Sequence, residues 1–254
     1  MPEQGDIDIS QPPQEGTDPE KSFRVDMGSR VETRSKILNI TVAFANNDIS
    51  REQYEVAILQ ALGTERTSDG KVTLYHAAPI DSLVAIVKDG AIKPATQTGN
   101  RTWRTIDEDN SSDEYDLKKK GKIYLATKLE AALIARKIQE HTGRGAFVLL
   151  STVDEERLQA DEDTGATNWV DSLASLGTCS YSGEISKFEV IARTPPALKR
   201  EDAIALAERV RSRPEDRQVV HNEISNRQKK IGTEEVSLVT SVNIDYNSLQ
   251  VIQG

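Results

Sequence analysis

The sequence predicts a fold that mixes α-helices and β-strands. Short apolar segments with the character of strands alternate along the chain with segments whose apolar residues recur at helical spacing. A continuous apolar run at 146–150 is typical of a strand that is buried on both faces. The chain of 254 residues is long enough to enclose a substantial core, as one large domain or as one domain with extensions.

The first 70 residues divide into two segments before the main domain begins. Residues 1–34 are rich in Asp, Glu, Gln, Gly and Pro, and so few large apolar residues predict a disordered tail. Residues 35–70 contain two short apolar patterns at helical spacing, the second capped by Asp48 and ended by Gly63. Helices this short are marginal alone, so we expect this segment to pack on the main domain, 71–254.

The main domain opens with two strand-then-helix units. The first is a strand at 72–76 and a helix at 81–89, and the second is a strand at 122–126 and a helix that ends near 141. Between the units, residues 95–120 form a polar interval. The buried strand at 146–150 follows, and then a polar excursion at 153–163 that Leu158 anchors.

The last third of the domain alternates helices with short strands. A helix is predicted at 169–176, strands at 178–185 and 188–191, and two helices at 197–211 and 215–229, so that 197–232 forms a helical insertion. The alternation in Glu-Val-Ser-Leu-Val at 235–239 predicts a strand, which 242–244 and 249–252 continue.

Composition restricts the possible partners. Apolar residues make up 37% of the chain and charged residues 29%, and no apolar run approaches the length that spans a membrane. The N-terminus lacks the pattern of a signal peptide, so we expect a cytoplasmic protein without membrane contact. A formal net charge of −9 argues against a broad phosphate-binding face, and we expect the basic clusters at 118–120 and 227–230 to be solvated.

Cys179 is the one cysteine in the sequence. A single cysteine excludes an internal disulfide and is in keeping with a reducing compartment. A lone thiol of this kind is more often a small buried side chain than a nucleophile, and we predict burial.

Each of the two strand-then-helix units carries a polar ring near the end of its strand. The first strand ends at His76 and the second contains Tyr124, and a helix start follows each of them. In the second unit, Thr127 and Glu130 have the spacing of a capping box. Because binding and catalytic residues concentrate where strands give way to turns, each of these two rings is a candidate site residue.

These residues resemble the two motifs of the ADP-ribosyltransferase superfamily, in its His-Tyr-Glu form. The first motif is a strand with Tyr-His-Gly/Ala and then a helix that ends in Gly-hydrophobic-x-Pro, as in Tyr75-His76-Ala77 and the Gly90–Pro94 segment. The second is a glycine, a strand with Tyr-hydrophobic-Ala and an alanine-rich helix, to which 121–132 correspond. The resemblance covers residues 72–153 and extends to the C-terminal strand.

The resemblance implies both a fold and an activity. The implied fold is α+β: a split, mostly antiparallel core of two sheets with flanking helices. The implied activity is cleavage of the bond between nicotinamide and ribose in NAD, with transfer of one ADP-ribose unit to an acceptor. NAD is then the co-substrate, no metal is needed, and a protein or a small molecule is the favoured acceptor.

The resemblance also assigns roles to the two rings. His76 would bond the ribose hydroxyls while the main chain beside it grips the nicotinamide amide, and Tyr124 would stack on the departing ring. Tyr75, Ala77 and Thr127 complete the NAD-binding set. Ala77 departs from the usual glycine and adds a methyl group where the main chain meets nicotinamide. We expect the imidazole and the phenol to line one cleft with an acid nearby.

Several residues compete for the role of the acid. The transition state of the transfer resembles an oxocarbenium ion, so a carboxylate is required beside the ribose. Glu235 opens a predicted late strand, as the family's glutamate does, and Glu234 would point to the opposite face. Glu184 follows a turn on an earlier strand. Asp161 and Asp163 resemble the acid of the rifampicin-modifying branch, which follows the tyrosine at a shorter spacing.

Two other functions remain open. RNA 2′-phosphotransferases share the fold and clamp RNA phosphates with arginines, a role that Arg101 and Arg104 could take. A degenerate transferase domain that binds NAD or ADP-ribose, or serves as a scaffold, is the other alternative.

Overall fold

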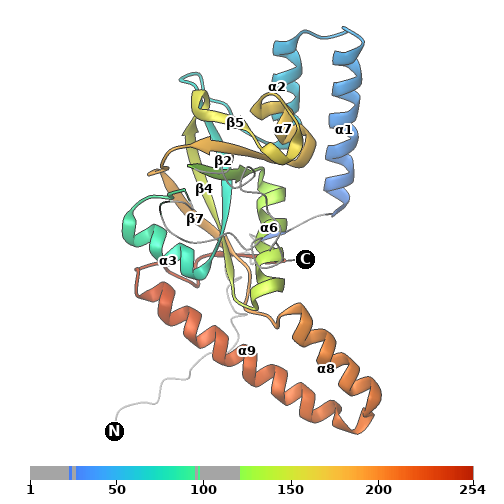
Figure 1. Cartoon of the computed structure of the whole chain (residues 1–254), viewed down its shortest axis with the longest axis vertical. Coiled ribbons are helices and arrows are strands. Elements are labelled where there is room, and N and C mark those ends of the chain that lie inside the picture. The colour runs from blue at the N-terminus through green and yellow to red at the C-terminus, as the bar shows by residue number, and fades with distance from the viewer. Residues whose placement is uncertain (1–22, 25–26, 95–96, 98–120, 254) are drawn as a thin grey trace, which may run out of the picture.

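The computed structural model describes residues 23–24, 27–94, 97 and 121–253. Helices flank a sheet in this part of the chain (Figure 1). The elements follow one another as β1 (Phe23–Arg24), α1 (Met27–Ala45), α2 (Arg51–Leu62), β2 (Lys71–Pro79), α3 (Ile80–Asp89), β3 (Lys122–Ala126), α6 (Lys128–Thr142), β4 (Ala146–Asp154), η2 (Glu155–Arg157), β5 (Leu158–Ala160), η3 (Glu162–Thr164), α7 (Trp169–Leu176), β6 (Thr178–Ser182), β7 (Phe188–Arg193), α8 (Arg200–Ser212), η4 (Pro214–Asp216), α9 (Arg217–Thr240) and β8 (Gln250–Gln253).

The described strands form a single mixed sheet. Its eight strands run in the order β1-β8-β7-β4-β2-β3-β6-β5. Neighbours are antiparallel except where β8 pairs with β1 and with β7. The α+β class is therefore as predicted, but the expectation of two sheets is wrong. One pair of residues, Tyr75 and Ala126, connects β2 to β3 and joins the two halves into one sheet.

That connection is short compared with the ladders on either side of it. Strand β2 pairs with β4 along all nine of its residues, from Lys71 to Pro79. Strand β3 likewise pairs with β6 along its whole length. Between β2 and β3 the register contains only Tyr75 with Ala126, so the two strands diverge from His76 onward. The sheet is continuous through this one pair, but β2 and β3 separate from His76 onward, and we call this separation the split between β2 and β3.

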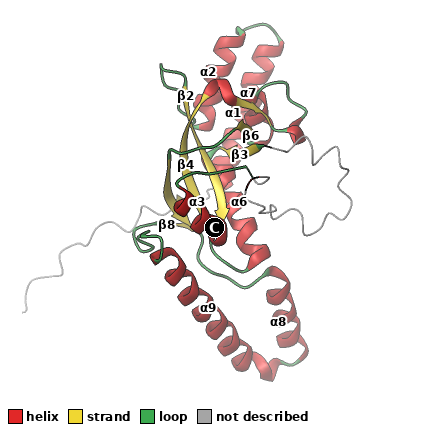
Figure 2. Cartoon of the chain, turned by 60° about the vertical axis from the view of Figure 1, so that its left-hand side comes forward, coloured by secondary structure: helices red, strands yellow, loops and turns green. Residues whose placement is uncertain are grey.

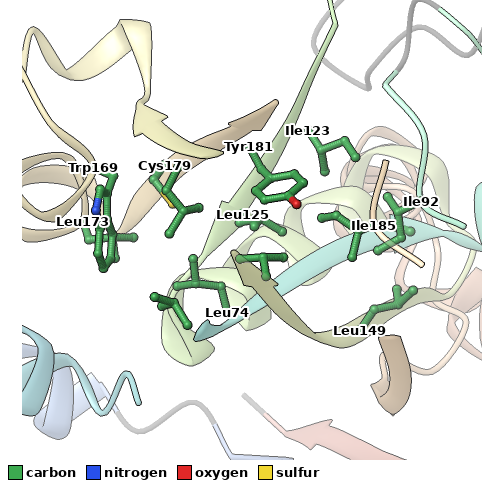
Figure 3. Packing of buried hydrophobic residues seen from close by; sticks show 14 of the residues in the cluster. Leu74, Ile92, Ile123, Leu125, Leu149, Trp169, Leu173, Cys179, Tyr181 and Ile185 are labelled. Atoms are coloured by element: carbon green, nitrogen blue, oxygen red, sulfur yellow. The ribbon is translucent and has the colours of Figure 1, made fainter. Parts of the chain in front are cut away.

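Apolar clusters lie on both faces of the sheet. The larger one includes Leu74, Leu125, Leu149 and the buried Cys179 (Figure 3). The smaller one is rich in alanine and lies under α6, which runs along the sheet (Figure 1). Its small side chains, Ala131, Ala132 and Ala135 among them, are almost completely buried, and small residues allow a helix to approach a sheet closely.

The first N-terminal helix is longer than the sequence indicated, and the second begins two residues later. Helix α1 begins at Met27, so the disordered tail predicted for 1–34 is wrong for its last residues; residues 1–22 lie outside the described part. The residues before 35 are mostly polar, so their sequence shows no apolar pattern at helical spacing. Ion pairs, such as that of Arg30 with Glu130 of α6, support this part of the helix. The cap of α2 is Ser50 rather than Asp48, in a capping box with Gln53.

Helix α2 is tied to the core by burial and by charge. Tyr54, Ile58 and Leu59 enter the larger cluster. Arg51 at its start donates to Asp171 of α7 and lies over the rings of Phe44 and Tyr54. The segment 35–70 thus packs on the sheet domain.

The C-terminal helices form a hairpin that extends away from the sheet (Figures 1 and 2). The helices predicted at 197–211 and 215–229 correspond to α8 and α9, but α9 continues to Thr240. The strand predicted at 235–239 is therefore wrong. In this stretch Glu235 and Val239, four residues apart, are buried while Ser237 between them is exposed, a pattern that belongs to a helix face and not to a strand. The strand at 249–252 is confirmed as β8, whereas 242–244 form a turn.

Across the described residues, we find no helix that combines the length and the apolar character needed to span a bilayer.

Candidate active site

His76 lies where β2 and β3 begin to diverge. Its Nδ1 is 2.9 Å from the main-chain carbonyl oxygen of Tyr124. A carbonyl oxygen can only accept, so Nδ1 carries the proton and donates. Burial lowers the pKa of His76, although the bond to the Tyr124 carbonyl acts in the opposite direction. The imidazole is therefore neutral near pH 7, and its Nε2 keeps a lone pair that can accept a hydrogen bond.

Tyr124 connects this histidine to a carboxylate. Its hydroxyl donates to Oε2 of Glu162 at 2.9 Å. Burial raises the pKa of Tyr124, and the adjacent Glu162 raises it further. The phenol therefore stays protonated and remains a hydrogen-bond donor over the whole physiological range. Tyr124 thus contacts His76 through its carbonyl and Glu162 through its hydroxyl.

Glu162 is a carboxylate beside Tyr124 that the sequence did not single out. It begins η3, and its other oxygen, Oε1, accepts from the ammonium of Lys122. Burial acts to raise the pKa of Glu162, but the bonds from Lys122, from its own main-chain amide and from Tyr124 lower it, and the net pKa lies below the ordinary value. Glu162 is accordingly a carboxylate at neutral pH. The sequence signal was present as an acidic run, of which only Asp161 and Asp163 were considered.

Asp161 has a structural role in the same turn. Its Oδ1 accepts from the main-chain amide of Asp163 at 3.1 Å, and its Oδ2 accepts from the Thr178 hydroxyl at 2.7 Å. The side chain is thus buried and committed to holding η3 against β6. The charges of Asp161 and Asp163 also raise the pKa of Tyr124, which places three carboxylates around one phenol.

The two rings lie on opposite faces of the sheet. Side chains alternate along a strand, so His76 shares the face of Leu74 and Ala78, which belong to the larger cluster. Tyr124 shares the face of Ala126, which belongs to the cluster under α6. The prediction that the imidazole and the phenol line one cleft is therefore wrong. The two residues come together only across the split between β2 and β3.

The predicted NAD-binding neighbours are near this split but are partly committed elsewhere. Tyr75 and Ala77 pack against the cluster under α6. Thr127 is buried and caps α6, with its hydroxyl accepting from the Glu130 amide at 3.3 Å. That bond is one half of the predicted capping box; in place of the other half, the Thr127 amide donates to the Gly177 carbonyl. The Thr127 side chain is thus directed at the helix.

Glu235 is not brought to the phenol. It is fully buried within α9, where its Oε1 accepts from the main-chain amide of Gly145. Gly145 directly precedes β4, whose first residue pairs with Pro79 at the far end of β2. The prediction of Glu235 as the acid opening a late strand is therefore wrong in its structural premise. Its contacts identify it as an anchor of α9.

The other two glutamates predicted as candidates for the acid are exposed. Glu184 lies in the turn after β6, where its charge contributes to raising the pKa of Lys93. Glu234 is exposed on α9 and lines a hollow of about 260 Å³ beside α8. A second hollow of about 490 Å³ is lined by Arg193, Lys229 and Tyr246 among others, and neither contains His76, Tyr124 or Glu162.

Three further expectations concern arginines, metal and thiol chemistry. Arg101 and Arg104, like the basic cluster at 118–120, lie outside the described residues. Among the residues that are described, no group of three His, Cys, Asp or Glu side chains could hold a metal ion. Cys179 is buried as predicted, and burial raises the pKa of its thiol, which is therefore protonated and unsuited to act as a nucleophile.

Comparison of the chain with family models, with curated proteins and with solved structures gave no match. The site is therefore argued from its own geometry.

Proposed function

We propose that the protein is an NAD-dependent ADP-ribosyltransferase that acts at the split between β2 and β3. The observation that carries the proposal is the position of Tyr124, which contacts His76 through its carbonyl and Glu162 through its hydroxyl. A neutral histidine, a protonated phenol and a carboxylate are thereby gathered around one break in the sheet. The resemblance to the transferase motifs concerns the same two strands.

The split supplies a place for nicotinamide. Among the described residues, β3 offers β2 no registered partner from His76 onward, and in this proposal a ligand amide would pair with the main chain at Ala77. A planar ring seated between the diverging strands can be approached by side chains from both faces. The His76 imidazole would then accept a hydrogen bond from a ribose hydroxyl through Nε2, and the Tyr124 ring would lie on the opposite side.

Glu162 supplies the charge that the reaction needs. The bond from C1′ of the ribose to the nicotinamide nitrogen breaks, and its electron pair neutralises the positive charge of that nitrogen. Positive charge develops on the ribose until the acceptor forms its bond to C1′ and loses a proton. A fixed carboxylate beside the ribose stabilises this charge. Glu162 fits that requirement better than Glu235, because it is ionised and bonded to Tyr124.

The decisive experiment measures binding and chemistry separately. The purified chain is titrated with NAD by calorimetry, and free nicotinamide is then followed by chromatography with water as the simplest acceptor. We expect binding and release in the wild type, and release reduced at least about a hundredfold in Glu162→Gln. Glu184→Gln is the matched control, because Glu184 is an exposed glutamate away from Tyr124, and it should behave as the wild type. Absence of NAD binding would overturn the proposal, and binding without release would reduce the protein to a nucleotide-binding one.

A further inference from the structure

Lys122 and Tyr124 lie two residues apart on β3 and therefore point to the same face of the sheet. Glu162 reaches both of them from η3. Its Oε1 accepts from the Lys122 ammonium, and its Oε2 accepts from the Tyr124 hydroxyl at 2.9 Å. With both oxygens held, the plane and the direction of the carboxylate are fixed. Each oxygen still has a second lone pair, so the group can also accept from a ligand hydroxyl.

The surroundings of Glu162 would otherwise oppose its charge. The carboxyl group is partly buried, and Asp161 and Asp163 lie on either side of it in the chain. Burial and neighbouring like charges both favour the protonated form of a carboxyl group. The ammonium of Lys122 is the cation that the structure places against it, and the pKa of Glu162 nevertheless lies below its ordinary value.

This ion pair differs from the others on the surface. The side chains of Lys122 and Glu162 are 20% and 15% exposed, compared with 36% and 66% for Arg144 and Asp81. Exposed pairs are screened by water and contribute little. A pair that is largely shielded and shares its carboxylate with a tyrosine has a stronger influence on the charge and orientation of that carboxylate.

We propose that Lys122 is a positioning residue of the transfer site, which keeps the Glu162 carboxylate ionised and directed toward Tyr124 and the split. This inference rests on the proposed function and adds to it a residue to which the recognised motifs assign no role. Lys122 acts through Glu162 and needs no contact with NAD.

Three substitutions of Lys122 test this role: two remove its positive charge and the third keeps a positive charge. Lys122→Met deletes the donor, Lys122→Gln keeps a neutral donor, and Lys122→Arg keeps the cation. Lys71→Met is the control, because Lys71 forms a more exposed ion pair with Asp154 at the other end of β2. Thermal melts identify the variants that fold. The first readout is the titration of Glu162, followed by NMR in protein with ¹³C-labelled glutamate carboxyl groups, with Glu162→Gln to assign the signal.

The second readout is the pH profile of nicotinamide release. In Lys122→Met and Lys122→Gln we expect the Glu162 signal to titrate at higher pH than in the wild type. Because the protonated acid cannot stabilise a cation, the ratio of the release rate at about pH 5.5 to that at about pH 8 should fall at least about threefold. In Lys122→Arg and in Lys71→Met, the titration of Glu162 and the ratio of the release rates should both match the wild type.

The outcomes separate this inference from the proposed function. If the wild type releases no nicotinamide but the Glu162 titration moves as expected, the transferase proposal fails and the control of Glu162 by Lys122 stands. If the wild type is active and neither neutral variant shifts the titration or the profile, Lys122 is only a structural residue and the inference is overturned. Should one neutral variant fail to fold, the other gives the same decision.

Discussion

The imidazole of His76 bonds to the main chain of Tyr124 and not to its side chain, with Nδ1 2.9 Å from the carbonyl oxygen. In a continuous ladder this carbonyl would accept from the neighbouring strand, but β2 and β3 diverge here. At this point the histidine supplies a side-chain donor to the carbonyl of Tyr124. The same bond fixes the tautomer and leaves Nε2 as an acceptor at the split.

Substitution of His76 can separate these two roles. In His76→Asn the side-chain amide can still donate to the Tyr124 carbonyl from a position close to that of Nδ1, but the acceptor at Nε2 is lost. We expect this variant to remain nearly as stable as the wild type and to bind NAD at least about tenfold more weakly. His76→Ala should lose both and unfold about 1–2 kcal/mol more easily in urea. Wild-type NAD affinity in His76→Asn, measured by calorimetry, would contradict the assignment of Nε2.

Substitution of Tyr124 tests the hydroxyl apart from the ring. Tyr124→Phe keeps the flat face but removes the donor to Oε2 of Glu162. We expect NAD affinity to stay within about threefold, because stacking needs only the ring, while nicotinamide release falls about tenfold as Glu162 loses one of its two fixed contacts. Tyr124→Ala should lose affinity as well. If Tyr124→Phe binds poorly but turns over normally, the hydroxyl serves binding and not the orientation of Glu162.

The sequence allowed the local half of this site to be predicted. Each strand-then-helix unit is local in the chain, from Lys71 to Asp89 and from Lys122 to Thr142, and the cap at Thr127 and the stop at Gly90 are local signals that the structure confirms. The adjacency of His76 and Tyr124 came from the resemblance. The sequence did not predict that the strands form one sheet, in which the single pair of Tyr75 with Ala126 connects β2 to β3.

The acid was misassigned because its neighbours are distant in the chain. Glu162 lies 40 residues after Lys122, and the pairing of β3 with β6 and of β6 with β5 brings them together. Glu235 was favoured because five residues of alternating character also fit one helix turn and a half. Such a short alternation does not distinguish a strand from the end of α9, where Glu235 faces Gly145.

Glu235 predicts a specific dependence of stability on pH. Burial raises the pKa of Glu235, while the Gly145 amide, Arg144, Arg193 and Tyr246 act to lower it. With the folded pKa above the unfolded one, the folded state binds the proton more tightly. The contribution of this group is thus fully present below the unfolded pKa, about 4.3, and is lost as the pH rises through the raised folded value. At pH values above the folded pKa, the stabilisation by Glu235 has been lost completely and no longer changes with pH.

Glu235→Gln removes this titration while keeping an acceptor for the Gly145 amide. We expect the free energy of unfolding of the variant, relative to that of the wild type, to increase with pH across the same interval, as measured by urea unfolding at a series of pH values. Glu234→Gln is the control, because Glu234 is exposed on the same helix, and its difference from the wild type should not change with pH. If the difference in free energy of unfolding between Glu235→Gln and the wild type does not change with pH, burial does not raise the pKa of the Glu235 carboxyl group.

Gly145 and Glu235 should also be coupled sterically. A Cβ added at Gly145 would lie 2.8 Å from Oε2 of Glu235 and 3.1 Å from the carbonyl oxygen of Thr194. Gly145→Ala therefore forces α9 or the strand to shift, and we expect it to cost about 1–3 kcal/mol of unfolding free energy. In a Glu235→Ala background the carboxylate is absent, so the same substitution should cost less, and a double-mutant cycle in urea measures the difference. Strict additivity would show that Thr194 alone limits the space. Because neither residue contacts Tyr124 or Glu162, nicotinamide release per folded molecule should be unchanged in all three variants.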